Sequence, residues 1–183
     1  MSYIAVRSAA ETALAAQPLG GRVELGPLPA PGGGAFALIR DPLGGGFTVI
    51  VGAGLSPPPR RPRHGEPAGH ALYVSEKASV APFHQALFGW RAALDANGSS
   101  DSVSSYRLFA EDAWSRRKVA RLIEAGEAIR GREEYWAAPF AVHALDAARA
   151  AILSAGGSII SESRGLLVDG DPTGAALFLQ PAA

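Results

Sequence analysis

Apolar and polar positions repeat one plan at the two ends of the chain. An apolar strand at Ile4–Val6 leads into an alanine-rich segment that ends at Gly20-Gly21, and Phe140–Val142 leads into another segment that ends at Gly156-Gly157. The interval from the valine to the first glycine is 14 residues in both copies. This spacing predicts a strand end, a helix of about three turns and a glycine stop. An internal repeat is stronger evidence of fold than composition.

The tetrapeptide Asp-Pro-x-Gly is a second shared element, at Asp41–Gly44 and at Asp171–Gly174. A turn-favouring acid comes first, the proline fixes φ near about −65°, and a glycine comes last, so the tetrapeptide predicts a turn. An apolar run follows each turn, at Phe47–Val51 and at Ala175–Leu179. Each copy therefore predicts strand, helix, strand, strand, strand.

The helices of the two copies carry their own signals. Ser8 and Glu11 form a capping box at the start of the first alanine-rich segment. The last helix is predicted from about Ala144 to Ala155, with an apolar stripe at helical spacing that indicates core packing. The members of this stripe are Leu145, Ala148, Ile152 and Ala155.

A less regular third unit lies between the copies, from Gly69 to Tyr135. His70–Ser75 predicts a strand, and Phe83–Trp90 predicts the end of a helix that a glycine terminates. Ser79 is a plausible N-cap for this helix, which would place Pro82 in the first turn, where proline is tolerated.

Two further strands are predicted in the middle unit, at Val103–Ala110 and Lys118–Ile123. The chain therefore reads as three βαβββ units. We expect a single module over residues 1–53, a proline-rich linker over 54–67, and a complete two-module domain over 68–183, because the prolines enforce an extended path.

Composition narrows the function classes. The 183 residues are 48% hydrophobic, which is ample for a buried core, and 17 basic residues balance 17 acidic ones. This neutrality gives no indication of binding to nucleic acid or to an anionic membrane. The absence of cysteine excludes disulfides and thiolate chemistry. Without a basic-apolar leader or an apolar run of about 18 residues, we expect a cytoplasmic protein that does not enter a membrane.

Five segments in a fixed order resemble the vicinal oxygen chelate superfamily, which includes glyoxalase, bleomycin-resistance and extradiol dioxygenase proteins. The resemblance is carried by Leu87–Trp90, Tyr106–Phe109, Tyr135-Trp136, Gly156-Gly157 and Asp171–Ala175. More narrowly, the chain is similar to the bacterial two-domain glyoxalase-like branch of that superfamily. The resemblance implies an α+β fold of repeated βαβββ modules, the glyoxalase/bleomycin resistance fold.

In that family two modules pair so that their curved mixed sheets form a cup that holds the ligand or the metal. The match covers Gly69–Pro181 as a complete pair of modules and Tyr3–Val51 as half of another. Metal-dependent members place His, Gln or Glu on the first strand and Glu on the last strand of each module. The matching positions here are Gly69, Ala71, Ala137, Pro139, Thr48 and Phe178. None of these residues is a good metal ligand, so we expect no metal and no cofactor.

His70 and Glu124 leave an alternative open. His70 is on the right strand but one residue out of register with the cup-facing positions, and Glu124 could reach the cup as a lone carboxylate. The alternative function is therefore a metal-dependent lyase or dioxygenase of the same superfamily that uses Glu124 and a histidine.

Aromatic side chains are the remaining candidates for the cup. Tyr73 and Phe178 are predicted to face inward, and Trp90, Tyr106 and Trp136 are predicted to lie near the mouth. Such rings suit a small hydrophobic or aromatic ligand, as in the bleomycin-resistance branch, which sequesters its ligand without metal. The second alternative is a non-catalytic dimeric scaffold whose cup the rings simply fill.

Three modules form an odd number for a fold whose cups need pairs. An unmatched curved sheet on the first unit would expose an apolar face to water, which is costly. We therefore expect a homodimer in which the first units of two chains pair across a two-fold axis. The competing account is that the first unit packs against the outside of the domain in its own chain.

Overall fold

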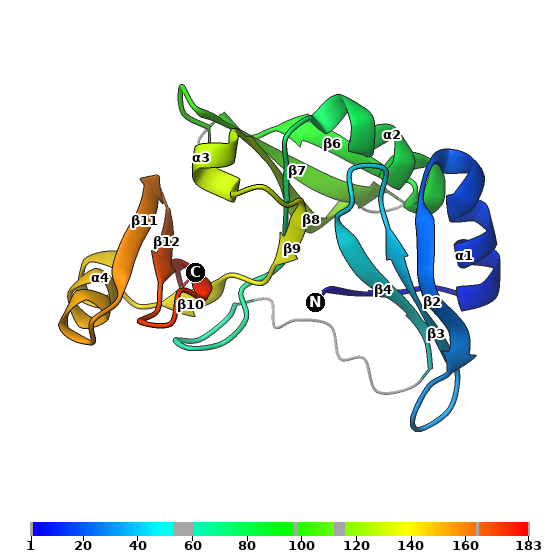
Figure 1. Cartoon of the computed structure of the whole chain (residues 1–183), viewed down its shortest axis with the longest axis horizontal. Coiled ribbons are helices and arrows are strands. Elements are labelled where there is room, and N and C mark those ends of the chain that lie inside the picture. Colours follow the sequence, from blue (N-terminus) through cyan, green and yellow to red (C-terminus); the bar gives the residue numbers. More distant parts are fainter. Residues whose placement is uncertain (1, 53–60, 97–98, 112–115, 164, 183) are drawn as a thin grey trace.

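A computed structural model describes residues 2–52, 61–96, 99–111, 116–163 and 165–182. Its strands form three separate sheets, two with four strands and one with five (Figure 1). In each unit a strand, a helix and then further strands follow one another along the chain, in the order predicted from the repeat. The α+β fold of βαβββ modules is therefore confirmed. Among the described helices, none is long and apolar enough to cross a membrane.

The first unit is a four-stranded sheet in the order β1-β4-β3-β2, with β1 parallel to β4. Its elements are β1 (Ser2–Ala5), α1 (Ala9–Ala16), the 3₁₀ turn Gln17–Leu19, β2 (Arg22–Pro29), β3 (Ala35–Arg40) and β4 (Gly46–Val51). Ser8 is the N-cap of α1, as the predicted capping box requires of it, and its Oγ accepts a hydrogen bond from the Glu11 backbone N–H at 3.2 Å.

The last unit repeats this topology, in the order β10-β13-β12-β11. Its elements are β10 (Phe140–Val142), α4 (Leu145–Ser154), β11 (Ser158–Ser163), β12 (Leu166–Gly170) and β13 (Ala176–Pro181). The predicted stripe on α4 is confirmed only in part, because its first three members are half-buried whereas Ala155 is exposed.

The glycine pairs that end the two helices are equivalent in detail. Gly20 and Gly156 have φ of 89° and 84°, a left-handed conformation that suits glycine. The next residue returns the chain to the helix end, since the Gly21 N–H donates to Ala16 O at 2.9 Å and the Gly157 N–H donates to Ile152 O at 3.0 Å.

The middle unit has a fifth strand, and its sheet runs β6-β7-β8-β5-β9. Its elements are β5 (Ala71–Val74), α2 (Lys77–Phe88), β6 (Trp90–Leu94), β7 (Val103–Glu111), β8 (Arg116–Ala125), α3 (Glu127–Arg130) and β9 (Tyr135–Ala137). The strand β9 lies antiparallel to β5 along its free edge. It carries the chain from the middle unit to the last one.

The prediction that Ser79 caps the middle helix is wrong. Helix α2 begins at Lys77 with Glu76 as its N-cap, so Ser79 is already helical and its hydroxyl donates to the Glu76 carboxylate. A carboxylate from a distant strand supports this earlier start, because Glu124 Oε1 accepts from the Lys77 backbone N–H at 2.8 Å. The predicted glycine stop is confirmed by Gly89, which has a φ of 69°.

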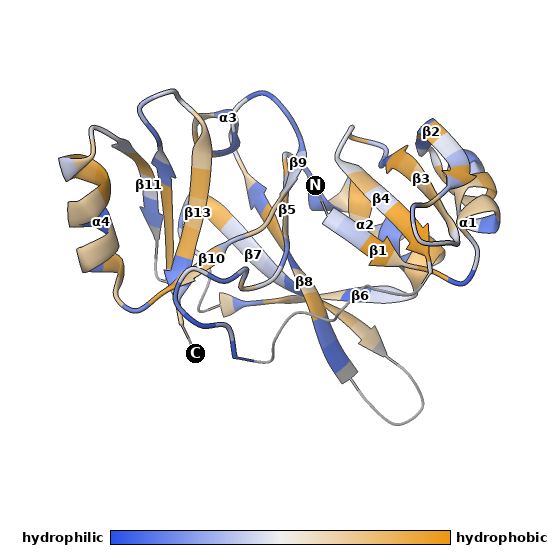
Figure 2. Cartoon of the chain, turned by 90° about the horizontal axis from the view of Figure 1, so that it is seen from below, coloured by the Kyte–Doolittle hydropathy of each residue, from blue (hydrophilic) through white to orange (hydrophobic). Residues whose placement is uncertain are grey.

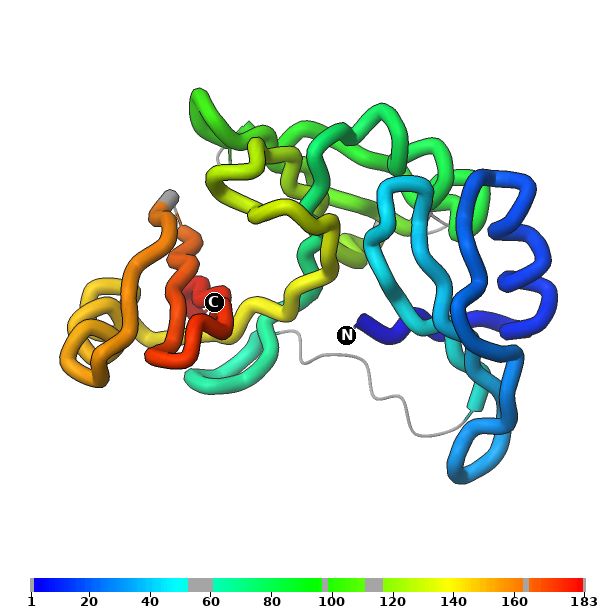
Figure 3. The backbone as a smooth tube through the Cα atoms, in the orientation of Figure 1, coloured from blue at the N-terminus to red at the C-terminus, as the bar shows by residue number. Residues whose placement is uncertain are grey.

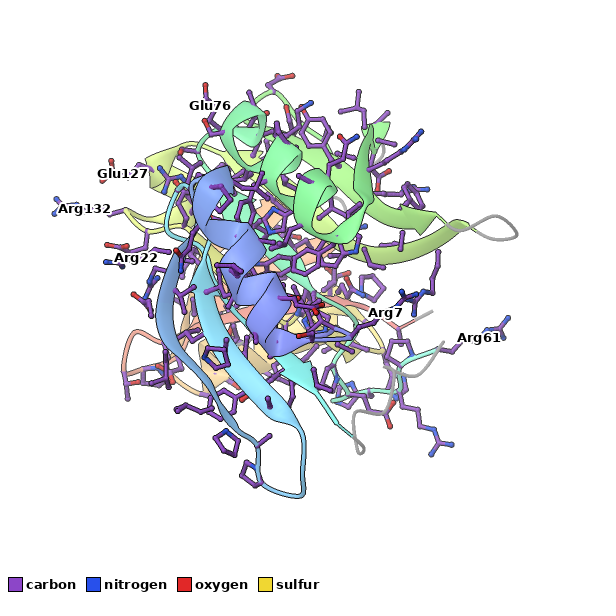
Figure 4. All side chains as sticks on the ribbon, turned by 90° about the vertical axis from the view of Figure 1, so that its right-hand side faces the viewer. Arg7, Arg22, Arg61, Glu76, Glu127 and Arg132 are labelled. Carbon is purple, nitrogen blue, oxygen red and sulfur yellow. The ribbon has the colours of Figure 1, made fainter. Side chains whose placement is uncertain are left out.

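The middle sheet has two different faces. Leu72, Val74 and Leu122 join α2 and the first unit in one buried cluster, in which Phe47 of β4 packs edge to face on Phe83 of α2 with ring centroids 6.2 Å apart. Figure 2 shows that the first unit's strands β1, β3 and β4 are largely apolar, and Figure 4 shows α1 and α2 side by side with Arg22, Glu76 and Arg132 pointing away from them.

The other face meets the last unit. Ala71, Tyr73 and Ile123 form a second cluster with Val168 and Phe178. The middle and last units therefore pack against each other through this cluster, in the region that we call the cup, and the first unit packs against the α2 side of the middle unit within the same chain. This arrangement matches the competing account given above, and the homodimer stays a prediction.

The described part of the predicted linker runs along the last unit. Residues 54–60 of the linker lie outside the described residues. Beyond them, Gly65 N–H donates to Ala141 O at 2.7 Å, Ala141 N–H donates to Glu66 O at 2.8 Å, and Pro67 bridges Phe140. The chain thus passes along the edge of β10 before it enters β5, a path that Figure 3 follows. The domain division at 54–67 stays a prediction.

Candidate functional site

Three aromatic rings from three strands meet inside the cup. Tyr73 of β5 stacks on Tyr135 of β9 at 5.1 Å between centroids, with an interplanar angle of 17°. Phe178 of β13 lies 5.1 Å from Tyr73 and 5.9 Å from Tyr135. The stack follows from strand register, because Tyr73 and Tyr135 are directly opposite in the antiparallel pair β5–β9. We call these three rings the cup cluster.

A cavity of about 440 Å³ opens beside the cup cluster. Its lining is almost wholly apolar and comes from β9, the following loop, β10 and β13, namely Tyr135, Trp136, Ala137, Ala138, Phe140, Ala176, Leu177 and Phe178. Small-molecule sites typically have volumes of about 300–1,000 Å³ and this apolar character. Tyr73 lies behind this lining and is only 1% exposed.

The two tyrosines keep their protons at neutral pH. Burial raises the pKa of Tyr73, and burial also raises the pKa of Tyr135. The Tyr73 hydroxyl has no hydrogen-bond partner among the described residues. The cup therefore offers flat apolar surfaces with phenol groups that can donate or accept a hydrogen bond.

The residues that face the cup do not fit a metal ion. Ala71 and Ala137 are buried apolar side chains beside Tyr73, and Phe178 packs against the same ring. Thr48 lies on β4 of the first unit, and its hydroxyl is a poor metal ligand. In the parts of the chain that the structure describes, no group of three or more His, Asp or Glu side chains is placed to hold a metal.

His70 and Glu124 point away from the cup cluster. Glu124 accepts the Lys77 N–H at the start of α2, and its other oxygen accepts from Tyr106 Oη at 3.3 Å. His70 Nδ1 lies 2.9 Å from Ser2 Oγ of the first unit, and burial lowers the pKa of its ring. The carboxylate and the imidazole that the enzyme alternative needs are therefore tied to the α2 helix and to the first unit.

The five predicted ligand-binding residues separate into two groups. Tyr73 and Phe178 meet in the cup cluster, as their strand positions predict. Trp90, Tyr106 and Trp136 pack instead with the α2 cluster on the opposite face of the middle sheet, although Trp136 also belongs to the cavity lining. Contact between these five residues and a ligand remains a prediction.

Tyr135 is the member of the site that the sequence reasoning did not select. It opens strand β9, and in the sequence its only significance was as part of the family resemblance. The sequence signal that could have identified it is the alternation of side chains along a strand. In the antiparallel pair β5–β9, Tyr135 is opposite Tyr73 and the next residue, Trp136, is opposite Leu72 on the other face.

Comparisons with known proteins inform the fold alone. No protein-family model matches this chain, and no curated protein matches it. Several solved structures do match. One is the halotolerant catechol dioxygenase BphC, with a TM-score of 0.53 and 13% identity over 100% of this chain and 67% of that chain. Two others are a mutant of 4-hydroxymandelate synthase from Streptomyces coelicolor and 2,2′,3-trihydroxybiphenyl 1,2-dioxygenase from Sphingomonas wittichii strain RW1, each with a TM-score of 0.53 and 12% identity over 99% of this chain and 70% of the other chain.

These neighbours are members of the vicinal oxygen chelate superfamily, and the alignment extends over the whole chain, all three units included. The resemblance found in the sequence is confirmed at the level of structure: the chain has the glyoxalase/bleomycin resistance fold of that superfamily.

Proposed function

We propose that the protein binds a small, planar, mainly apolar molecule in the cavity beside the cup cluster. The observation that carries the proposal is the meeting of Tyr73, Tyr135 and Phe178 at a cavity of about 440 Å³. Tyr135 and Phe178 present their rings to this cavity, and stacked or edge-on aromatic contacts are worth about 0.5–1.5 kcal/mol each beyond burial.

The donor chemistry supports binding rather than metal-assisted turnover. The cup-facing positions that would carry ligands are filled by Ala71, Ala137 and Phe178. A ligand would be held by shape, apolar contact and a hydrogen bond to a protonated phenol. Two of the neighbours are named for aromatic substrates, catechol and trihydroxybiphenyl, which agrees with a flat ring system as the ligand class.

The test is calorimetric titration of the untagged full chain with 2-naphthol, a neutral planar phenol. We expect saturable binding with one site per chain. Ala176→Trp should abolish it, because Ala176 lines the cavity and a large ring there fills the space without removing a buried side chain. Ile160→Trp is the matched control, since Ile160 is 47% exposed on β11 and outside the lining.

Failure of 2-naphthol and of other flat phenols to bind the wild type would overturn the proposal, as would equal binding by the Ala176→Trp variant. The first outcome would favour a non-catalytic scaffold. That second function has an observation of its own, because Tyr73, Ile123 and Phe178 are 1%, 4% and 7% exposed and so already fill the deep part of the cup.

A further inference from the structure

A second cavity, of about 580 Å³, lies outside the cup, between the first unit and the middle unit. Strand β1 forms one side of it, and residues from the end of α2 and from β6, β7 and β8 form the other. Its aromatic wall consists of Phe88, Trp90 and Trp136. Phe88 and Trp90 have centroids 4.8 Å apart, and Trp90 meets Trp136 nearly at a right angle, 6.3 Å between centroids and 70° between planes.

This wall is held firmly from behind. The His84 ring is parallel to the Trp90 ring at 5.8 Å and approaches Trp136 edge on at 5.9 Å. His84 is 1% exposed, and its Nδ1–H donates to Val80 O of the same helix at 3.0 Å. The two indoles therefore present fixed faces to the cavity, which lowers the entropic cost of stacking a flat ligand on them.

Both fully charged side chains in the lining are basic. Arg117 and Lys118 come from the start of β8, and none of the described lining residues is a carboxylate. Neither side chain forms an ion pair with another described residue, whereas nearby Arg107 is held by Asp95 through two hydrogen bonds of 2.9 and 2.8 Å. The Asp95 carboxylate also attracts Lys118 at longer range, but it is hydrogen-bonded to Arg107, so neither cavity cation has an ion-pair partner of its own among the described residues.

The surroundings of Lys118 add to this positive field. Partial burial lowers its pKa, the positive charges of Arg121 and Arg107 lower it further, and the Asp95 carboxylate opposes them. An anion placed beside Arg117 and Lys118 would relieve that repulsion. His70 adds a polar ring to the same lining, from the strand position next to β5.

We propose that this cavity is a second binding site, for a planar aromatic carboxylate. The aromatic part of the ligand lies against Phe88, Trp90 and Trp136, and its carboxylate meets Arg117 and Lys118. Arg117 is directly opposite Ala110 of the lining, so its guanidinium can hold the carboxylate in charge-assisted hydrogen bonds, and Lys118 adds a second positive charge beside it. The site does not rest on the function proposed for the cup, because its cations belong to the opposite end of the middle sheet. Among the described lining residues, the two cavities share Trp136.

The probe is 2-naphthoate, titrated calorimetrically into the full chain, with methyl 2-naphthoate as its neutral counterpart. We expect the acid to bind about tenfold more tightly than the ester, and each of Arg117→Ala and Lys118→Ala to weaken the acid by about three- to tenfold, consistent with one charge-assisted contact each. Added salt should weaken the acid but not the ester. Both cations are exposed, so the variants should fold.

Arg132→Ala is the matched control, because Arg132 is 88% exposed and does not line the cavity. Ala176→Trp separates the two proposals: it should abolish 2-naphthol binding in the cup and leave 2-naphthoate binding unchanged. The second site is overturned if 2-naphthoate does not bind, if it binds no better than its ester, if Arg117→Ala and Lys118→Ala leave it unchanged, or if Ala176→Trp removes it.

Discussion

Asp41 and Asp171 make the same pair of backbone hydrogen bonds in equivalent turns, but only Asp41 is buried. Asp41 Oδ1 accepts from the N–H groups of Leu43 and Gly45 at 3.0 and 2.9 Å. Asp171 Oδ1 accepts from the residues at the same positions in its own turn at 2.8 and 2.9 Å. The difference comes from packing, because Leu72 of the middle unit lies against the first turn, and Asp41 is only 3% exposed.

The pKa values of the two carboxyl groups are therefore shifted in opposite directions. Burial raises the pKa of Asp41 from 3.8 to about 6. The hydroxyl of Thr173 and the backbone N–H groups of its turn lower the pKa of Asp171.

We predict that Asp41→Asn stabilises the protein at neutral and alkaline pH. An acid whose pKa is raised in the folded state favours folding when it is protonated, so its contribution is lost as the pH rises from 3.8 through about 6. The asparagine removes the buried charge and keeps an acceptor for both N–H groups. The gain in the free energy of unfolding should grow from near zero at pH 4 to at most about 3 kcal/mol at pH 8, as followed by urea denaturation.

Asp171→Asn is the matched control, and its effect should have the opposite sign. A carboxyl whose pKa is lowered by folding stabilises above its unfolded pKa and loses that contribution as the pH falls through its folded pKa. This variant should be less stable than the wild type at pH 7 and equal to it in strong acid. Equal effects of the two substitutions at pH 8 would show that the burial of Asp41 has no energetic consequence.

The sequence predicted the parts of the fold that rest on local chemistry. Gly20-Gly21, Gly156-Gly157 and the two Asp-Pro-x-Gly turns act within a few residues, and they stand where expected with the expected bonds. The start of α2 was misplaced for a non-local reason. The side chain that accepts the Lys77 N–H belongs to Glu124, which lies 47 residues further along the chain. Ser79 was predicted as the N-cap only because of its position in the local sequence pattern.

The candidate site could be predicted only as far as strand alternation reaches. Alternation places Tyr73 and Leu72 on opposite faces of β5, and the two side chains belong to different buried clusters. It could not assign Trp136 or Trp90 to a face, because that depends on β9 pairing with β5 and on the first unit packing over α2. Both are long-range contacts with no local sequence signal.

His84 provides a second prediction, on acid sensitivity. Burial among aromatic rings lowers its pKa from 6.5 to about 4, and its Nε2 has no partner among the described residues. Folding therefore favours the neutral ring. Its contribution to the free energy of unfolding is fully present above pH 6.5 and is lost as the pH falls toward about 4. His84→Phe should remove this loss, which is at most about 3 kcal/mol.

The His84 and Asp41 contributions oppose each other in the same pH window. The wild type should consequently show a flatter pH profile of unfolding free energy between pH 4 and 6.5 than either single variant. A His84→Phe profile parallel to that of the wild type over this range would contradict the assignment.

Tyr73 gives a third prediction, because its hydroxyl is buried and has no described hydrogen-bond partner. Tyr73→Phe keeps the ring stack with Tyr135 and removes an unsatisfied polar group, so it should raise the free energy of unfolding by about 1 kcal/mol. Tyr106→Phe is the control, since its hydroxyl donates to Glu124 at 3.3 Å and its loss should cost about 0.5–1 kcal/mol. The prediction fails if Tyr73→Phe is the more damaging of the two in denaturant titrations.

Substitution of Glu124 distinguishes two roles for its carboxylate, a structural cap of α2 and a metal ligand. As the acceptor of the Lys77 N–H at the positive end of α2, it should stabilise the fold, and Glu124→Ala should cost about 1–2 kcal/mol. Glu124→Gln should cost less, because the amide oxygen still accepts that bond without the charge. Mass spectrometry of untagged wild type and both variants, purified without chelator and dialysed against nickel, zinc, manganese and iron, supplies the second readout. If the Glu124 carboxylate only caps α2, all three proteins should have the same metal content. Near-stoichiometric metal that disappears in Glu124→Ala would instead make this carboxylate a ligand. That result would favour the lyase or dioxygenase alternative over a binding protein.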